Sequence, residues 1–135
     1  LITDGFDIKP ISVSGLKNTD VRYLQVQSDI VVDMLTFGFF GANIREGLML
    51  GKTCVCFLRP EWLESMKKQI PEYVSELPVI SATPETIKEI LINLIENPKK
   101  RDQIGIKGRK FAMKWHSSIS GAKRMNEIYS SVLGI

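Results

Sequence analysis

Residues 29–51, DIVVDMLTFGFFGANIREGLMLG, decide the predicted fold. Ile30–Val32 is a continuous β-branched run, which is typical of a parallel strand covered on both faces. Residues 36–41 cannot continue that strand smoothly, because they include two glycines, which tolerate positive φ and close backbone approach. Good helix formers fill residues 42–50, and Gly51 stands where a helix C-cap is expected. This stretch therefore predicts a strand, a glycine-rich turn and a helix.

A glycine-rich turn at a helix N-terminus is suited to binding an anion. The first N–H groups of a helix have no partner within it, and the helix dipole adds positive charge at the same end. Glu46 lies about one helical turn further on, where its carboxylate can accept hydrogen bonds from a pair of sugar hydroxyls. The alternative is an ordinary βα unit with a tight loop, since a short Gly-x-x-Gly is common.

The composition of the 135 residues is that of a single globular domain with its own core. Hydrophobic residues make up 44% of the chain, which argues against disorder, and no apolar run approaches the length of a membrane-spanning helix. Cys54 and Cys56 lie two apart in a predicted strand, so they share one face and are expected to be buried, reduced thiols. Reduced thiols favour a cytoplasmic location.

Apolar runs and helix caps predict the remaining elements. Strands are expected at residues 11–13, 52–58 and 77–81, and helices at residues 20–27, 61–69, 83–96 and, as terminal helices, about 99–133. The predicted capping residues are Asp20, Thr83 and Ser118. In the first helix Val21, Leu24 and Val26 are expected to point inward. The alternation of strands and helices predicts an α/β fold, with a mostly parallel, Rossmann-like sheet flanked by helices and a ligand at the carboxyl ends of its strands.

Several segments of this chain carry motifs of a known family. They include SDIVVD at residues 28–33, GFFG at 38–41, and REGLMLGKTCVCF at 45–57, which looks like a Glu-Ala-Met-Ala-x-Gly-Lys-Pro-Val run. Residues 76–116 follow with a Pro-containing strand, a helix, an Asn-Pro break and a Gly-Arg helix, before a last helix that contains Ile-Tyr. In order and spacing these motifs resemble the nucleotide-sugar-binding half of retaining GT-B glycosyltransferases. The resemblance covers most of the chain, from about Asp20 to Tyr129.

This resemblance implies that residues 1–135 form a single donor-binding domain of a glycosyltransferase, incomplete at its N-terminus. Such an enzyme transfers a sugar from a nucleoside diphosphate sugar to a hydroxyl acceptor, and GT-B enzymes generally need no metal or other cofactor. The implied partners are the nucleotide-sugar donor and an N-terminal GT-B domain that holds the acceptor site. The chain alone is therefore expected to be inactive, and its sequence identifies no catalytic base, nucleobase, sugar or acceptor.

The implied donor-nucleotide site consists of Gly38, Phe39, Phe40, Gly41, Ala42, Asn43 and Glu46. The diphosphate is expected over residues 39–43, on the N–H groups of Gly41, Ala42 and Asn43, with the ribose on Glu46. In the family two glutamates commonly stand eight positions apart; Glu46 matches the second, but Gly38 occupies the first position. This departure motivates one alternative, a non-catalytic GT-B-like binding or scaffold module. A nucleotide-sugar epimerase-like enzyme is a further alternative.

Two further sets of polar residues are open to interpretation. Arg59 and Glu61 follow the strand predicted at 52–58, where the family often has an arginine and a glutamate near the donor; a solvated pair is the alternative. His116 is the only histidine, and a structural or capping role is expected for it.

The charge of the C-terminal part is lopsided. Residues 99–124 carry nine Lys or Arg against Asp102 alone. A solvated helix face, docking to an anionic membrane surface and nucleic-acid binding are the competing interpretations. No interleaving of aromatic and basic residues supports the last of these, so no nucleic-acid partner is predicted. Peripheral contact with an anionic membrane stays open beside the solvated helix face.

Overall fold

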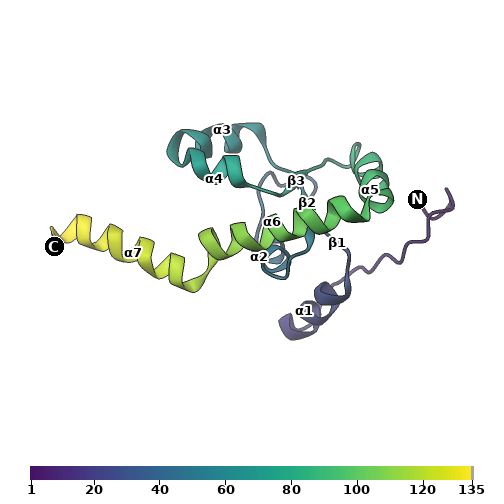
Figure 1. Cartoon of the computed structure of the whole chain (residues 1–135), viewed down its shortest axis with the longest axis horizontal. Helices are drawn as coiled ribbons and strands as arrows, with labels where there is room; N and C mark the ends of the chain where they lie inside the picture. Colours follow the sequence, from purple (N-terminus) through teal and green to yellow (C-terminus); the bar gives the residue numbers. More distant parts are fainter. Residues whose placement is uncertain (135) are drawn as a thin grey trace.

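The computed structural model describes residues 1–134 as a three-stranded sheet with seven helices (Figure 1). In chain order the elements are α1 (Asn18–Gln27), β1 (Ile30–Val32), α2 (Ala42–Met49), β2 (Thr53–Cys56), α3 (Pro60–Gln69), α4 (Pro71–Glu76), β3 (Ile80–Ser81), α5 (Ile87–Glu96), α6 (Pro98–His116) and α7 (Ser118–Leu133). Residues 1–17 precede the first helix as an arm without a helix or strand.

All three strands are parallel and follow the order β1-β2-β3. Ile30 pairs with Thr53, and Val55 pairs with Ile80. Parallel neighbours require a crossover connection, and helices α2, α3 and α4 supply it. The predicted α/β fold with a Rossmann-like parallel sheet flanked by helices is therefore confirmed.

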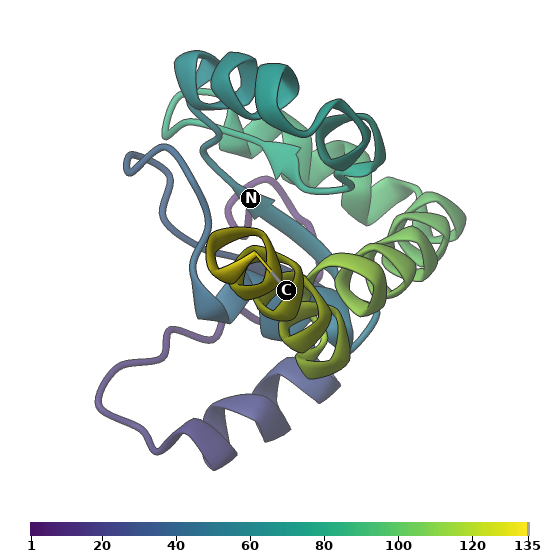
Figure 2. The same cartoon turned by 90° about the vertical axis from the view of Figure 1, so that its left-hand side faces the viewer.

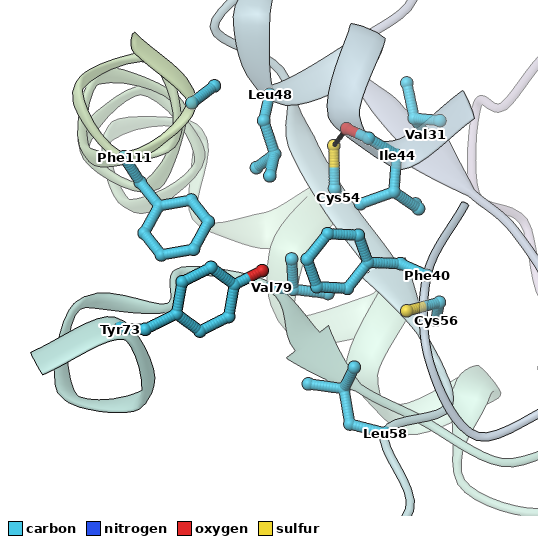
Figure 3. Packing of buried hydrophobic residues seen from close by; sticks show 11 residues of the cluster. Val31, Phe40, Ile44, Leu48, Cys54, Cys56, Leu58, Tyr73, Val79 and Phe111 are labelled. Carbon is cyan, nitrogen blue, oxygen red and sulfur yellow. Dashed lines mark hydrogen bonds between the residues drawn. The ribbon is translucent and has the colours of Figure 1, made fainter. Parts of the chain in front are cut away.

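The central strand β2 is buried along its whole length and divides the core into two parts. Cys54 and Cys56 point to one face, where they pack with residues of α2, α4 and α6 (Figure 3). Val55 points to the other face and packs with Leu94 of α5. Helices therefore cover both faces of the sheet, as the end-on view also shows (Figure 2).

Both cysteines are buried free thiols on the same face, as predicted. Burial raises the pKa of Cys54 to about 12 and that of Cys56 to about 11. The Cys54 Sγ donates a weak hydrogen bond to the Ile44 carbonyl, 3.7 Å away (Figure 3). Both groups therefore act as small core side chains in the folded protein.

Helix α6 is the longest element and lies close to α2 and β2 (Figure 1). Gly105 and Gly108 make this close approach possible, because a Cβ at Gly105 would overlap the Gly51 carbonyl oxygen. Helix α7 extends beyond the body of the protein and has no buried residue (Figure 1). The two terminal helices thus exist as predicted, but only α6 belongs to the core.

The N-terminal predictions need three corrections. Residues 11–13 form no strand, because their backbone groups pair with none of the described strands. Helix α1 begins at Asn18 and not at the predicted cap Asp20, and Val26 is exposed while Gln25 is buried. Strand β1 is an edge strand that is covered only in part: Val31 is buried in one part of the core and Ile30 packs against the other, but Val32 is 41% exposed.

Further predicted boundaries were too generous. Strands β2 and β3 are shorter than the apolar runs at residues 52–58 and 77–81. Beyond β2 the first run rejoins the sheet only through an isolated parallel bridge between Leu58 and Gly38. Helix α5 begins at Ile87, and residues 84–86 before it form a turn. Ser117, and not Ser118, caps α7 by accepting a hydrogen bond from the Ser120 N–H. The short helix α4 was not predicted at all.

No helix within residues 1–134 is long and apolar enough to cross a bilayer.

Candidate functional site

The candidate site lies where β1 leads through a loop into α2. Gly38 in this loop has a φ of +107°, which only glycine adopts readily. Its carbonyl accepts a hydrogen bond of 2.7 Å from the Arg59 N–H, at the end of the next strand segment. The Arg59 guanidinium lies over the glycine and donates a 3.0 Å hydrogen bond to the Phe37 carbonyl. The loop is therefore shaped by contact between Gly38 and Arg59.

The second glycine of the loop is less special. Gly41 has a φ of −99°, so it does not use the positive φ that glycine tolerates. It is the N-cap of α2, and no side chain caps this helix end. Within residues 1–134 the N–H groups of Gly41, Ala42 and Asn43 donate no hydrogen bond. These three groups and the positive end of the helix dipole together form a place for an anion.

Glu46 on α2 faces helix α1. Its carboxylate accepts hydrogen bonds from Asn18 Nδ2 at 3.2 and 3.4 Å, and from Arg22 Nη2 at 3.5 Å. The side chain is 26% exposed, so solvent still reaches it. Two carboxylate oxygens offer about four acceptor sites, so a further donor can still be accommodated. Helix α1 therefore fixes the carboxylate while leaving part of it accessible.

Asn43 is held by the same helix. Gln25 Nε2 donates to the Asn43 side-chain oxygen at 2.6 Å and to its carbonyl at 3.2 Å. The Asn43 side chain is thus committed to α1, and only its backbone N–H is left for a ligand. Gln25 Oε1 is buried and has no partner among the described residues. The residue Gln25 lines a groove of about 440 Å³ between residues 10–13, α1 and the open edge of β1.

The two phenylalanines predicted for the site differ in position. Phe40 is buried and packs edge-on against Trp62 and His116, so its side chain belongs to the core (Figure 3). Phe39 is 44% exposed and packs against Phe37, with 4.6 Å between the ring centres. Of the predicted site residues, Phe40 therefore contributes only its backbone to the loop surface.

His116 lies in an aromatic cluster with Phe40, Tyr73 and Phe111. Its Nε2 is 3.1 Å from the Tyr73 hydroxyl. Burial, reinforced by the positive charges of Arg45 and Arg124, lowers the pKa of His116 to about 4. This agrees with the structural role expected for the histidine, and the cluster anchors the loop at Phe40.

Acidification is expected to destabilise the fold through His116. Between pH 6.5 and pH 4 the unfolded chain binds a proton at this position while the folded chain does not. The free energy of unfolding therefore decreases as the pH is lowered through this range. Because the ring is only half-buried, we expect a loss of about 1 to 2 kcal/mol. Urea denaturation of the wild type and of His116→Gln at both pH values measures it. The stability advantage of the wild type should shrink on acidification; a constant difference would contradict the prediction.

The predicted pair Arg59 and Glu61 does not form a common site. Arg59 contacts the loop at Gly38, as described above. Glu61 lies in the first turn of α3 and makes no ion pair with any described residue. Within residues 1–134 no group of three or more His, Cys, Asp or Glu is placed to hold a metal ion.

Sequence reasoning missed the contribution of α1. Asn18, Arg22 and Gln25 point at α2 and hold Glu46 and Asn43. Their spacing of four and three residues puts them on one helix face, which is the signal that identifies such a polar stripe. Apolar periodicity, which supports the helix predictions, does not reveal this polar stripe.

Comparisons with protein-family models, with curated proteins and with solved structures found no match for this chain.

Proposed function

We propose that this chain is the donor-binding domain of a GT-B-type glycosyltransferase. The diphosphate of a nucleotide sugar would lie over residues 39–43, and Glu46 would bind the ribose. The observation that supports this most is the presence of unpartnered N–H groups and a carboxylate on the same helix. Glu46 lies about 6 Å along the helix axis from Ala42, at a rise of about 1.5 Å per residue. A phosphate and its adjoining sugar ring can bridge that separation.

The proposed reaction transfers a sugar to a hydroxyl acceptor. The bond between the anomeric carbon and the diphosphate breaks, and the negative charge of the leaving group increases. Aligned N–H groups and the α2 dipole stabilise such charge without reorganisation. Arg59, exposed beside Gly38, adds a positive charge at the same loop. The acceptor site and the catalytic base would belong to a second domain, so we expect no transfer by this chain alone.

Ribose binding at Glu46 would add to the contacts from α1 without displacing them. The bonds from Asn18 and Arg22 are 3.2 to 3.5 Å long and partly exposed, so they are weak. Ribose hydroxyls would use the remaining lone pairs, while Asn18 and Arg22 hold the carboxylate in its orientation. The proposal thus needs no large movement of the side chain.

A non-catalytic binding module is the second candidate. The position of the first family glutamate is taken by Gly38, and the Arg59 side chain occupies the space beside it. A carboxylate that would bind the donor sugar is therefore missing. Such a module would bind a nucleotide weakly or not at all, and its role would be to hold a partner.

Nucleotide titration followed by backbone amide NMR tests the proposal. With UDP, GDP or ADP we expect shifts confined to residues 38–46, and one nucleotide should bind more tightly than the others. Glu46→Ala should weaken binding about 10- to 100-fold, as expected for the loss of hydrogen bonds to a charged group. Glu64→Ala, which removes an exposed carboxylate of α3, is the matched control and should bind as the wild type does.

Two results would count against a donor site. If shifts appear but Glu46→Ala and Glu64→Ala bind equally well, the ribose is not on Glu46. If no nucleotide shifts any amide, the titration is repeated on a longer chain that includes an upstream domain. If the longer chain also shows no amide shifts, the glycosyltransferase proposal is rejected and the non-catalytic module is favoured.

A further inference from the structure

Helix α6 presents a basic surface with apolar residues embedded in it. We define the α6 outer face as Lys99, Lys100, Ile106, Lys107, Lys110 and Met113, all of which are exposed. Its opposite side is in the core, since Gly105, Gly108, Phe111 and Ala112 are buried. Helical spacing therefore separates α6 cleanly into a packed side and a free side.

The cations of the α6 outer face are largely free. Among the described residues Lys99, Lys107 and Lys110 form no ion pair, and Lys100 contacts only the neutral Asn93 side chain, 2.6 Å away. Asp102 is the only acidic residue of the helix. Lys114 is different, because Glu72 and Glu76 neutralise it at 2.7 Å each. An excess of positive charge, and so a positive potential, therefore remains over the first four turns of α6.

Two apolar side chains stand within this potential. Ile106 is 59% exposed and Met113 is 50% exposed, and both line a shallow hollow together with Arg109, Lys110 and Lys114. Lys99, Ile106, Lys110 and Met113 follow one another at intervals of three, four or seven residues, so they form one line along the helix. Cations and apolar groups thus share one surface about 21 Å long, at about 1.5 Å per residue.

We propose that the α6 outer face docks the protein on an anionic lipid bilayer. Lysines would lie at the phosphate level, and Ile106 and Met113 would enter the boundary between headgroups and acyl chains. Lysine suits this position because its stem packs on apolar groups while its ammonium reaches the headgroups. The inference depends on charge complementarity with anionic lipid, and it is independent of nucleotide binding at α2.

Nucleic acid fits this surface less well. Its phosphates could bind the lysines, but the exposed Ile106 and Met113 would find no apolar surface to pack against. Binding of single strands also uses aromatic side chains for base stacking, and the α6 outer face has none. We therefore do not propose nucleic acid as the partner. Binding to a short duplex or single strand is compared with vesicle binding in the experiment.

Vesicle co-sedimentation of the whole chain tests the proposal. We expect binding to phosphatidylcholine vesicles that contain roughly a third phosphatidylglycerol, no binding to pure phosphatidylcholine, and weaker binding as salt is raised. Lys107→Glu with Lys110→Glu should reduce affinity at least about 25-fold, at about fivefold per lysine removed. Lys67→Glu with Lys68→Glu makes the same change in net charge on the exposed surface of α3 and should retain most of the binding.

A second set of variants tests the contribution of the apolar side chains to vesicle binding. Ile106→Ser with Met113→Ser should reduce affinity about tenfold. Ile119→Ser with Met125→Ser removes exposed apolar groups from α7 and should have little effect. Equal losses in the α6 and α3 charge variants, or in the α6 and α7 serine variants, would overturn the proposal. So would tighter binding to a short duplex or single strand than to the anionic vesicles at the same salt.

Discussion

Gly105→Ala is expected to destabilise the protein more than any other single methyl addition to α6. The added Cβ would overlap the carbonyl oxygen of Gly51, which is backbone and cannot rotate away. Helix α6 would have to move off the end of α2, and overpacking of this kind costs about 1 to 3 kcal/mol. Alanine is the better helix former by about 1 kcal/mol, so the net loss measured is smaller than the packing cost itself. Because the overlap is with backbone, we expect a packing cost near the upper end of this range, about 3 kcal/mol, and so a net loss of about 2 kcal/mol.

Two hydrogen bonds make a shift of α6 costly. The Thr53 hydroxyl donates to the Arg101 carbonyl at 2.9 Å, and Arg109 Nη1 donates to the Met49 carbonyl at 2.6 Å. They lie one turn before and one turn after Gly105. Displacement of the helix at Gly105 would lengthen both, so the substitution cannot be accommodated by a local adjustment.

Urea denaturation followed by circular dichroism measures the effect, and the chain supplies its own controls. A Cβ at Gly121 on α7 meets nothing within 4 Å, so Gly121→Ala should be neutral or gain up to about 1 kcal/mol. A Cβ at Gly108 would lie 3.0 Å from Leu48 Cδ2, the end of a side chain, so Gly108→Ala should fall between the other two. Equal stabilities of the Gly105 and Gly121 variants would show that α6 is not held at this contact.

This contact also marks a limit of sequence reasoning. The strand, loop and helix of residues 29–51 were predicted because their signals are local: a β-branched run, two glycines in the loop and Gly51 at the helix end. The C-cap itself is Leu50, and Gly51 follows it with a φ of +73°. The requirement for glycine at 105 depends on a carbonyl 54 positions away and leaves no local signal. In the same way, nothing in the sequence places Phe40 against His116.

The predicted strand lengths were wrong for a related reason. A strand is defined by its partner, and the run at residues 52–58 pairs without interruption only over β2, before Leu58 bridges to Gly38. Residues 11–13 have the pattern of a strand but no partner. The polar stripe of α1 was predictable in principle, because Asn18, Arg22 and Gln25 share one helix face. Polar periodicity on a helix beside a candidate site is therefore as informative as apolar periodicity.

The two glycines of the GFFG loop are expected to respond very differently to substitution. Gly38→Ala should cost about 1 to 3 kcal/mol, because φ is +107° and the new Cβ would lie 2.9 Å from Arg59 Nε and 3.0 Å from Arg59 Cβ. Gly41→Ala should cost less than about 1 kcal/mol, the difference between glycine and alanine at an N-cap. Its φ is −99°, and the new Cβ would make only an ordinary 3.7 Å contact with Met34. Urea denaturation compares the pair directly.

Gly38→Glu extends this test to the carboxylate that the family resemblance leads one to expect at position 38. Any side chain there meets the same backbone strain and the same Arg59 contacts, so Gly38→Glu should be destabilised about as much as Gly38→Ala. An exposed ion pair with Arg59 would offset at most about 1 kcal/mol. If Gly38→Glu is instead as stable as the wild type, the loop can adopt a second conformation that accepts a carboxylate. In that case Gly38 would not by itself distinguish a non-catalytic module from a donor-binding domain. The predicted loss would mean that the loop was shaped around Arg59, with a guanidinium where a carboxylate was expected.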